Sequence, residues 1–177
     1  MQHKTILGID PGTKEMGFAV LRGKELLAFG VRTLRNGTRP HDVVGQARRV
    51  VLDLVARYAP AVVAIEEPLM IATKRAAVMS VIVQELRGRA EELGAIVEEL
   101  SPREIREKVV GNSEATKIEV AEALVRDGFD QLAALIPRRP ARAALGLRPR
   151  DKYWLHMFDA LALTAAVSES GDVGTEA

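Results

Sequence analysis

Two short, largely apolar runs, each ending in a carboxylate, constrain the fold of this chain more than any other feature of its sequence. Residues 5–9 lead into Asp10, and residues 61–65 lead into Glu66. Each run has the length and composition of a buried strand, and in each the acid is the first charged residue that follows. Two such strands can hold their carboxylates close together at one edge of a sheet.

Carboxylates crowded at the edge of a sheet need a cation between them, because like charges repel and burial removes their hydration. A divalent metal ion is the simplest such cation. Metal ions held by carboxylates at the edge of a sheet usually act on phosphodiesters. Asp10 and Glu66 therefore predict a metal-dependent nuclease.

A third acid is predicted to join the same site. His156 and Asp159 lie three residues apart in a segment expected to be helical, so they share one face of that helix. Apolar residues surround them in the sequence, which is typical of a buried helix. An aspartate in a buried helix is costly unless a cation or a full set of donors compensates it. We therefore assign Asp159 to the site of Asp10 and Glu66.

Length and composition exclude several classes of protein. The 177 residues fit one domain with a proper core, with 47% hydrophobic and 28% charged residues. No apolar stretch approaches the ~18–20 residues of a membrane span, and no signal-peptide core follows the first residues. The chain has no cysteine, which excludes disulfides and thiolate chemistry. We therefore expect a cytoplasmic protein without a membrane partner.

The distribution of charge favours a nucleic-acid partner, although the net charge is only +1. Between Arg126 and Lys152 the chain carries seven basic residues against three acids. A basic stretch of this kind lets a nearly neutral protein bind DNA, and a solvated arginine-rich loop is the alternative.

Apolar periodicity and turn residues predict an α/β fold with a five-stranded mixed sheet, three antiparallel strands followed by parallel strands, flanked by helices. We expect strands over about residues 4–10, 16–21, 26–34, 61–66 and 95–100. We expect helices over about residues 40–58 and 74–93, from residue 102, and over about residues 113–127 and 153–167. Residues 1–167 would form a single domain with a basic insertion at about 128–152, followed by a disordered tail at 168–177.

Motifs in four places resemble the RuvC family of Holliday junction resolvases, in the order in which that family carries them. They are residues 6–13 with Gly17, residues 64–66, residues 109–111 followed by Lys117, and residues 159–162. The resemblance covers most of the chain, and the ordered set of motifs makes it specific.

The resemblance implies an RNase H-like fold and a homodimer that nicks two opposed strands of a four-way DNA junction, in recombination and repair. It implies a metal site of Asp10, Glu66, His156 and Asp159 with two Mg²⁺ ions, for which Mn²⁺ would substitute. It places the protein at the nucleoid in the cytoplasm, and allows a branch-migration motor as a further partner.

The resemblance also implies roles for basic and loop residues. Lys117 would be catalytic by balancing charge on the attacked phosphate, while Thr13 and Arg106 would contact DNA. After Glu66 the family commonly carries an aromatic wedge that this chain lacks, so Leu69 or Met70 would act as an apolar wedge. The basic insertion is longer than expected for the family, and an extra duplex arm would be bound by its Arg138, Arg139 and Arg142, with plain surface decoration as the alternative.

Other functions remain open. Residues 10–13 also resemble the first phosphate loop of actin-like kinases and ATPases, but those proteins need a second similar domain that is not present here. Closer alternatives are a YqgF-like nuclease that acts on RNA and a nuclease for other branched DNA. From a different class comes a catalytically silent junction-binding protein, against which the four intact metal positions argue.

Overall fold

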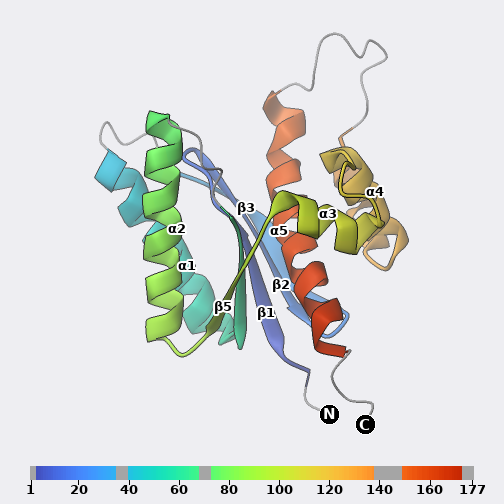
Figure 1. The fold of residues 1–177 in the computed structure, drawn as a ribbon, viewed down its shortest axis with the longest axis horizontal. Coiled ribbons are helices and arrows are strands. Elements are labelled where there is room, and N and C mark those ends of the chain that lie inside the picture. Colours follow the sequence, from blue (N-terminus) through green and yellow to red (C-terminus); the bar gives the residue numbers. More distant parts are fainter. Residues whose placement is uncertain (1–2, 35–39, 68–72, 138–148, 173–177) are drawn as a thin grey trace.

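A mixed five-stranded sheet forms the middle layer of the protein (Figure 1). Its strands are β1 (Thr5–Asp10), β2 (Glu15–Arg22), β3 (Glu25–Thr33), β4 (Val62–Glu66) and β5 (Ile96–Leu100). They lie in the order β3-β2-β1-β4-β5, in which β1, β2 and β3 are antiparallel neighbours and β4 and β5 run parallel to β1. This computed structural model describes residues 3–34, 40–67, 73–137 and 149–172. The predicted mixed sheet is confirmed.

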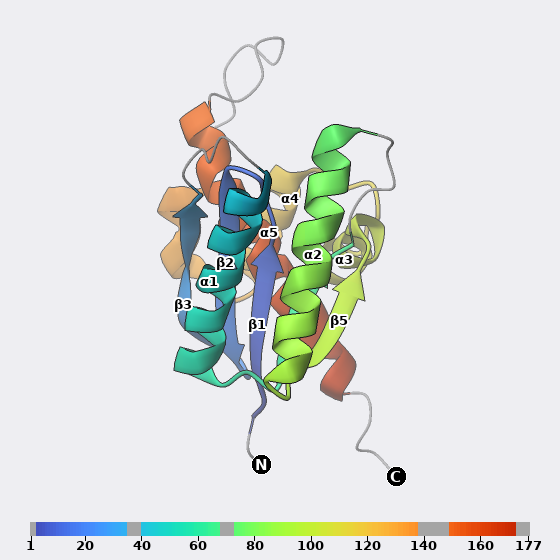
Figure 2. The ribbon, with the colours of Figure 1, turned by 90° about the vertical axis from the view of Figure 1, so that its left-hand side faces the viewer.

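Helices cover both faces of the sheet. Two of them, α1 (Pro40–Tyr58) and α2 (Lys74–Glu92), lie side by side on one face, which is turned toward the viewer in Figure 2. The other face carries α5 (Pro149–Asp172), against which α3 (Pro102–Val110) and α4 (Lys117–Arg126) pack (Figure 1). Among the described helices, none is long and apolar enough to cross a membrane.

Each central strand divides its side chains between two cores, because successive residues point to opposite faces of a sheet. On β1, Leu7 and Ile9 join the core beneath α1 and α2, whereas Ile6 joins the core beneath α5. β4 follows the same alternation. The two acids that end these strands, Asp10 and Glu66, therefore lie on the α5 face of the sheet.

Helix α5 lies directly on the backbone of β1 and β2 at two glycines. A Cβ atom on Gly8 would overlap the carbonyl oxygen of Ala160, and one on Gly17 would overlap the carbonyl oxygen of His156. These obstacles belong to the helix backbone and cannot rotate away, so both positions require glycine. The close approach brings the turn of α5 that carries His156 onto the strand residue paired with Asp10.

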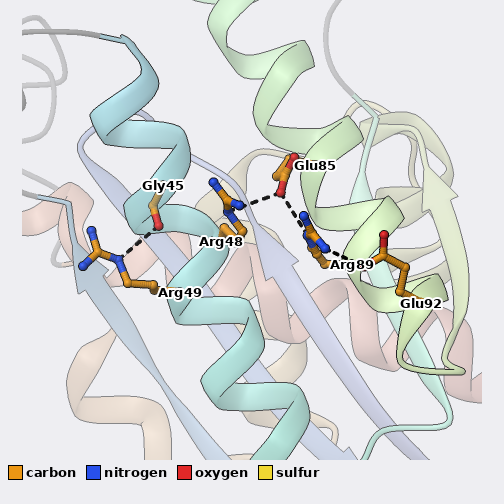
Figure 3. Close-up of polar contacts among 6 residues, drawn as sticks. All are labelled: Gly45, Arg48, Arg49, Glu85, Arg89 and Glu92. Atoms are coloured by element: carbon orange, nitrogen blue, oxygen red, sulfur yellow. Dashed lines mark hydrogen bonds and ion pairs between the residues drawn. The ribbon is translucent and has the colours of Figure 1, made fainter.

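The ion pair between Arg48 and Glu85 joins α1 to α2 in the layer on the opposite face, and further pairs lie within α2 (Figure 3). The carboxylate of Glu85 lies 3.3 Å from the guanidinium of Arg48 and 3.1 Å from that of Arg89. Arg89 also pairs with Glu92 at 2.6 Å. Exposed pairs of this kind each contribute at most ~1 kcal/mol. The apolar contact of α1 and α2 with the sheet therefore holds this layer, and the ion pairs add little to it.

The helix expected from residue 113 begins later, at Lys117. Thr116 caps it by accepting a hydrogen bond from the backbone N–H of Glu119, while the Glu119 carboxylate accepts one from the backbone N–H of Thr116. This reciprocal capping box starts a helix at one defined residue. The prediction placed the start at Ser113 and did not use the spacing of Thr116 and Glu119, which marks the cap.

Helix bounds in the C-terminal part of the chain differ from the expected ones, and residues 138–148 and 173–177 of the expected insertion and tail lie outside the described residues. The segment expected to be a loop insertion over 128–152 contains a 3-10 helix, Asp130–Leu135, anchored by the fully buried Leu132, and ends in the first turn of α5. Helix α5 begins at Pro149, since proline is tolerated in a first turn. It also continues to Asp172, where a tail was expected, because no proline or glycine follows Val167 before Gly171.

The contact between α5 and the sheet predicts that Gly17→Ala destabilises the fold. The new methyl group must displace helix backbone, so we expect the free energy of unfolding to fall by about 1–3 kcal/mol in urea denaturation. Gly88→Ala is the matched control, because nothing lies within 4 Å of a Cβ atom at that position of α2. There alanine should be neutral or stabilising. Equal losses of stability in the two variants would contradict the proposed contact.

Candidate active site

Asp10 is the most buried acid of the site, with 7% of its surface exposed. It ends β1, where Pro11 follows, and the chain then turns back tightly into β2. A Cβ atom on Gly12 would overlap the carbonyl oxygen of Glu15, so the turn depends on glycine. In β2, Gly17 pairs with Asp10 and lies against α5. The Asp10 carboxylate is therefore fixed between the edge of the sheet and that helix.

His156 of α5 lies between two carboxylates. Its Nδ1 is 2.6 Å from Oδ2 of Asp10, and its Nε2 is 3.5 Å from Oε2 of Glu15. The hydrogen bond with Asp10 raises the pKa of His156 above its ordinary value, although burial acts in the opposite direction. The hydrogen bond thus holds the imidazole against Asp10.

Asp159 pairs with Lys117, the first residue of α4. The Asp159 side chain is 11% exposed and that of Lys117 is 49% exposed, so the lysine covers the aspartate from the solvent side. Burial and the charge of Asp10 raise the pKa of Asp159, although Lys117 opposes them. Burial alone would lower the pKa of Lys117, but the charges of Asp159 and Asp10 outweigh it and the net pKa is raised. The structure therefore places Lys117 in contact with Asp159, one of the predicted acids.

Glu66 belongs to the same site, because the charges of Asp10 and Asp159 act on its carboxyl group. It ends β4, the neighbour of β1 in the sheet. Burial, followed by the charges of Asp10 and Asp159, raises the pKa of Glu66 from 4.5 to about 7, against smaller opposing effects of Lys117 and Arg106. A nearby cation would favour the ionised form of this carboxyl group.

The donor set fits a divalent cation. Asp10, His156 and Asp159 each offer one ligand atom, and these atoms lie within 4.8 Å of one another. Carboxylate oxygens are ordinary ligands of Mg²⁺ and Mn²⁺, and a neutral imidazole nitrogen is a ligand of transition-metal ions. A cation here would also oppose the burial and the charges of Asp10 and Asp159 that raise the pKa of Glu66. Asp10, His156 and Asp159 would hold the cation, with Glu66 on the β4 side.

Two hollows flank the pair of Lys117 and Asp159. The larger has a volume of about 660 Å³, and its lining includes Glu66, Arg103 and Arg106. The smaller has a volume of about 380 Å³, and its lining includes Thr116, Ile118, Lys152, Leu155 and His156. The lining of the two hollows combines acids with the cations Arg103, Arg106, Lys117 and Lys152, which suits an anionic chain that passes over the site.

The predicted site residues divide into three groups. Five come together: Asp10, Glu66, Lys117, His156 and Asp159. Arg106 lines the larger hollow, and Thr13 is half-buried in the turn after β1. The remaining predictions lie outside the described residues: Leu69, Met70, Arg138, Arg139 and Arg142.

Two residues of the site were missed by sequence reasoning. Glu15 contacts His156, and Arg103 lines the larger hollow. The turn at residues 11–12 was a usable signal for Glu15, since a tight turn places the start of the next strand beside Asp10. Arg103 has no distinguishing signal beyond its place in the first turn of α3.

Comparison with known proteins identifies relatives of this chain. The family model of crossover junction endodeoxyribonuclease RuvC matches residues 6–143. The RuvC crossover junction endodeoxyribonuclease of Bacteroides fragilis is 31% identical over 138 residues, which are 71% of this chain and 70% of the relative. That of Chlorobaculum parvum is 32% identical over 135 residues, 68% of this chain and 67% of the relative.

Solved structures share the fold. Thermus thermophilus RuvC in complex with Holliday junction substrate has a TM-score of 0.73 and 24% identity, and the match covers 98% of each chain. The yeast mitochondrial Holliday junction resolvase Ydc2 has a TM-score of 0.63 and 16% identity, over 92% of this chain and 77% of the other. The structural match to T. thermophilus RuvC continues beyond residue 143 into α5. Because the family model matches most of the chain and the B. fragilis relative exceeds 30% identity, this protein belongs to the RuvC family.

Proposed function

We propose that this protein is a metal-dependent endonuclease that resolves four-way DNA junctions. The cluster of Asp10, His156 and Asp159, with ligand atoms within 4.8 Å of one another, is the observation that carries the proposal. Relatives described as crossover junction endodeoxyribonucleases support the reaction, and a structural neighbour in complex with Holliday junction substrate supports the choice of DNA.

The three acids would bind cations from different elements of the fold. Divalent cations at this site, which we propose to be two Mg²⁺ ions with Mn²⁺ as a substitute, would supply an activated water and charge for the leaving oxygen. Asp10 is central, with Glu66 toward β4 and Asp159 on α5. Each of these carboxylates must be ionised to bind a cation, and their burial keeps them in one geometry.

Cationic residues on the walls of the two hollows would bind the sugar–phosphate backbone. Lys117 belongs to both hollows, so its ammonium group is placed to contact the phosphate over the site. Arg103 and Arg106 line the larger hollow, and Lys152 lines the smaller one. Backbone contacts of this kind position a strand without reading its sequence.

Paired nicks on opposed strands require two active sites, and we propose that a homodimer supplies them. Large apolar side chains are exposed in the region of α2 and β5: Val81 at 55%, Leu93 at 54% and Ile96 at 60%. Exposed apolar residues of this size support an interface between subunits. A cytoplasmic, nucleoid-associated role and cooperation with a branch-migration motor belong to the same proposal.

Asp10→Asn tests the assignment of the reaction. We expect cleavage of a labelled four-way junction to fall by about 10³-fold while junction binding is retained, because the amide preserves the shape but removes the charge. The assay compares the junction with a duplex, a flap and an RNA–DNA hybrid, each with Mg²⁺, Mn²⁺ or EDTA. Asp53→Asn, at an exposed acid of α1, is the matched control and should cleave normally. Undiminished cutting by Asp10→Asn would refute the assignment, and preferred cutting of flaps or hybrids would move the protein to another nuclease branch.

Cation binding is predicted to weaken below pH 7. A carboxyl pKa that is raised from 4.5 to about 7 contributes stability at low pH, which is lost as the pH rises through this window unless a cation replaces the proton. Mg²⁺ should therefore raise the melting temperature more at pH 8 than at pH 6. In Glu66→Gln this pH difference should shrink. An equal thermal shift at both pH values in the wild-type protein would contradict the role of Glu66.

The basic segment upstream of α5 provides a separate test of DNA binding. Replacing Arg138, Arg139 and Arg142 together by alanine should weaken junction binding and flatten its dependence on salt, because fewer counterions are released. Fluorescence anisotropy across a salt series measures both effects. An unchanged slope would exclude these arginines from the DNA contact.

A further inference from the structure

Glu15 contacts the side of the His156 ring that faces away from Asp10. Its Oε2 lies 3.5 Å from Nε2 of His156, while Nδ1 of the same ring lies 2.6 Å from Asp10. The two side chains are half-buried, with 33% of Glu15 and 30% of His156 exposed. The proposed cleavage chemistry assigns no role to Glu15.

The position of Glu15 follows from the local backbone. The turn that depends on Gly12 returns the chain so that β2 begins at Glu15, beside the end of β1. Glu15 and Gly17 are two residues apart on one strand, so they face the same side of the sheet. The carbonyl oxygen of His156 lies on Gly17, and the His156 ring extends from there toward Glu15. The contact between the two side chains is therefore built into the packing of α5.

We propose that Glu15 is a positioning residue that holds His156 in the orientation and tautomer needed to bind a divalent cation. A histidine ligand offers one nitrogen to the cation and keeps its proton on the other. A carboxylate that accepts this proton fixes the ring and increases the basicity of the ligand nitrogen. A cation would take the place of the proton in the hydrogen bond between Nδ1 and Asp10. With the remaining proton on Nε2 directed at Glu15, the lone pair of Nδ1 would then face the side of Asp10 and Asp159.

This inference rests on the proposed function, because it assumes a cation at the cluster of Asp10, His156 and Asp159. It adds a fourth side chain to that cluster, from the start of β2. The contribution of Glu15 is specific to the histidine: without an imidazole at position 156, the Glu15 carboxylate has no ring to orient. A double-mutant cycle can therefore isolate its role from that of a negative charge acting at a distance.

The test measures the dissociation constant of Mn²⁺ at pH 8, by the loss of its free electron paramagnetic resonance signal, with no DNA present. Glu15→Ala should weaken Mn²⁺ binding by about 10- to 100-fold, as loss of an orienting carboxylate does elsewhere. Glu15→Gln should lose less, because its amide oxygen still accepts the Nε2 proton. Glu25→Ala removes an exposed acid at the start of the neighbouring β3 and should bind Mn²⁺ like the wild-type protein.

Two further readouts separate positioning from general electrostatics. In a His156→Ala background, Glu15→Ala should cause no additional loss of Mn²⁺ affinity. Nitrogen-15 NMR of the Mg²⁺-loaded wild-type protein should place the His156 proton on Nε2, and Glu15→Ala should lose this preference.

Three outcomes would overturn the inference. Equal Mn²⁺ affinities of Glu15→Ala and Glu25→Ala would remove the role of Glu15. An equally large effect of Glu15→Ala without His156 would reduce that role to net charge. If the wild-type protein binds no Mn²⁺, the proposed function fails together with the inference, whereas in the first two cases the cation site stands.

Discussion

The direct contact between the backbone of α5 and the strands β1 and β2 is the constraint on which the candidate site depends. Gly8 and Gly17 allow it, because any side chain at either position would collide with a carbonyl oxygen of the helix. The contact sets the height of α5 above the sheet, and thereby the distance of its His156 and Asp159 from Asp10. Buried apolar residues of α5 on the same face keep the helix in place. The interface between α5 and the sheet therefore both stabilises the fold and positions the residues of the candidate site.

Charge balance is the second organising principle. Three carboxylates converge on this interface, and the structure provides two partial counterweights, since Lys117 pairs with Asp159 and His156 with Asp10. Within the described residues no such pair is seen for Glu66, and its pKa is raised first by burial and then by the charges of Asp10 and Asp159. A site that is well packed yet short of positive charge is suited to bind a cation. In the proposed function, the same imbalance lets this site bind a cation beside the highly anionic backbone of DNA.

Much of this arrangement could be predicted from sequence, for identifiable reasons. Strand alternation and the position of Asp10 and Glu66 after apolar runs were enough to place both acids at one edge of the sheet, and helical spacing paired Asp159 with His156. The contact of Glu15 with His156 was not predictable, because it depends on how α5 lies across β2. The start of α4 and the length of α5 were missed because local capping and the absence of helix breakers decide them. The predicted wedge and insertion arginines remain predictions.

The measurement that tests the central claim most directly is anomalous diffraction from crystals of the wild-type protein grown with Mn²⁺ at pH 8. If α5 and the sheet together build a cation site, the strongest anomalous peak will lie among Asp10, His156 and Asp159, next to Glu66. A peak at another place, or none at this cluster while its acids are ionised, would contradict the account. It would mean that the carboxylates are balanced by Lys117 and His156 alone.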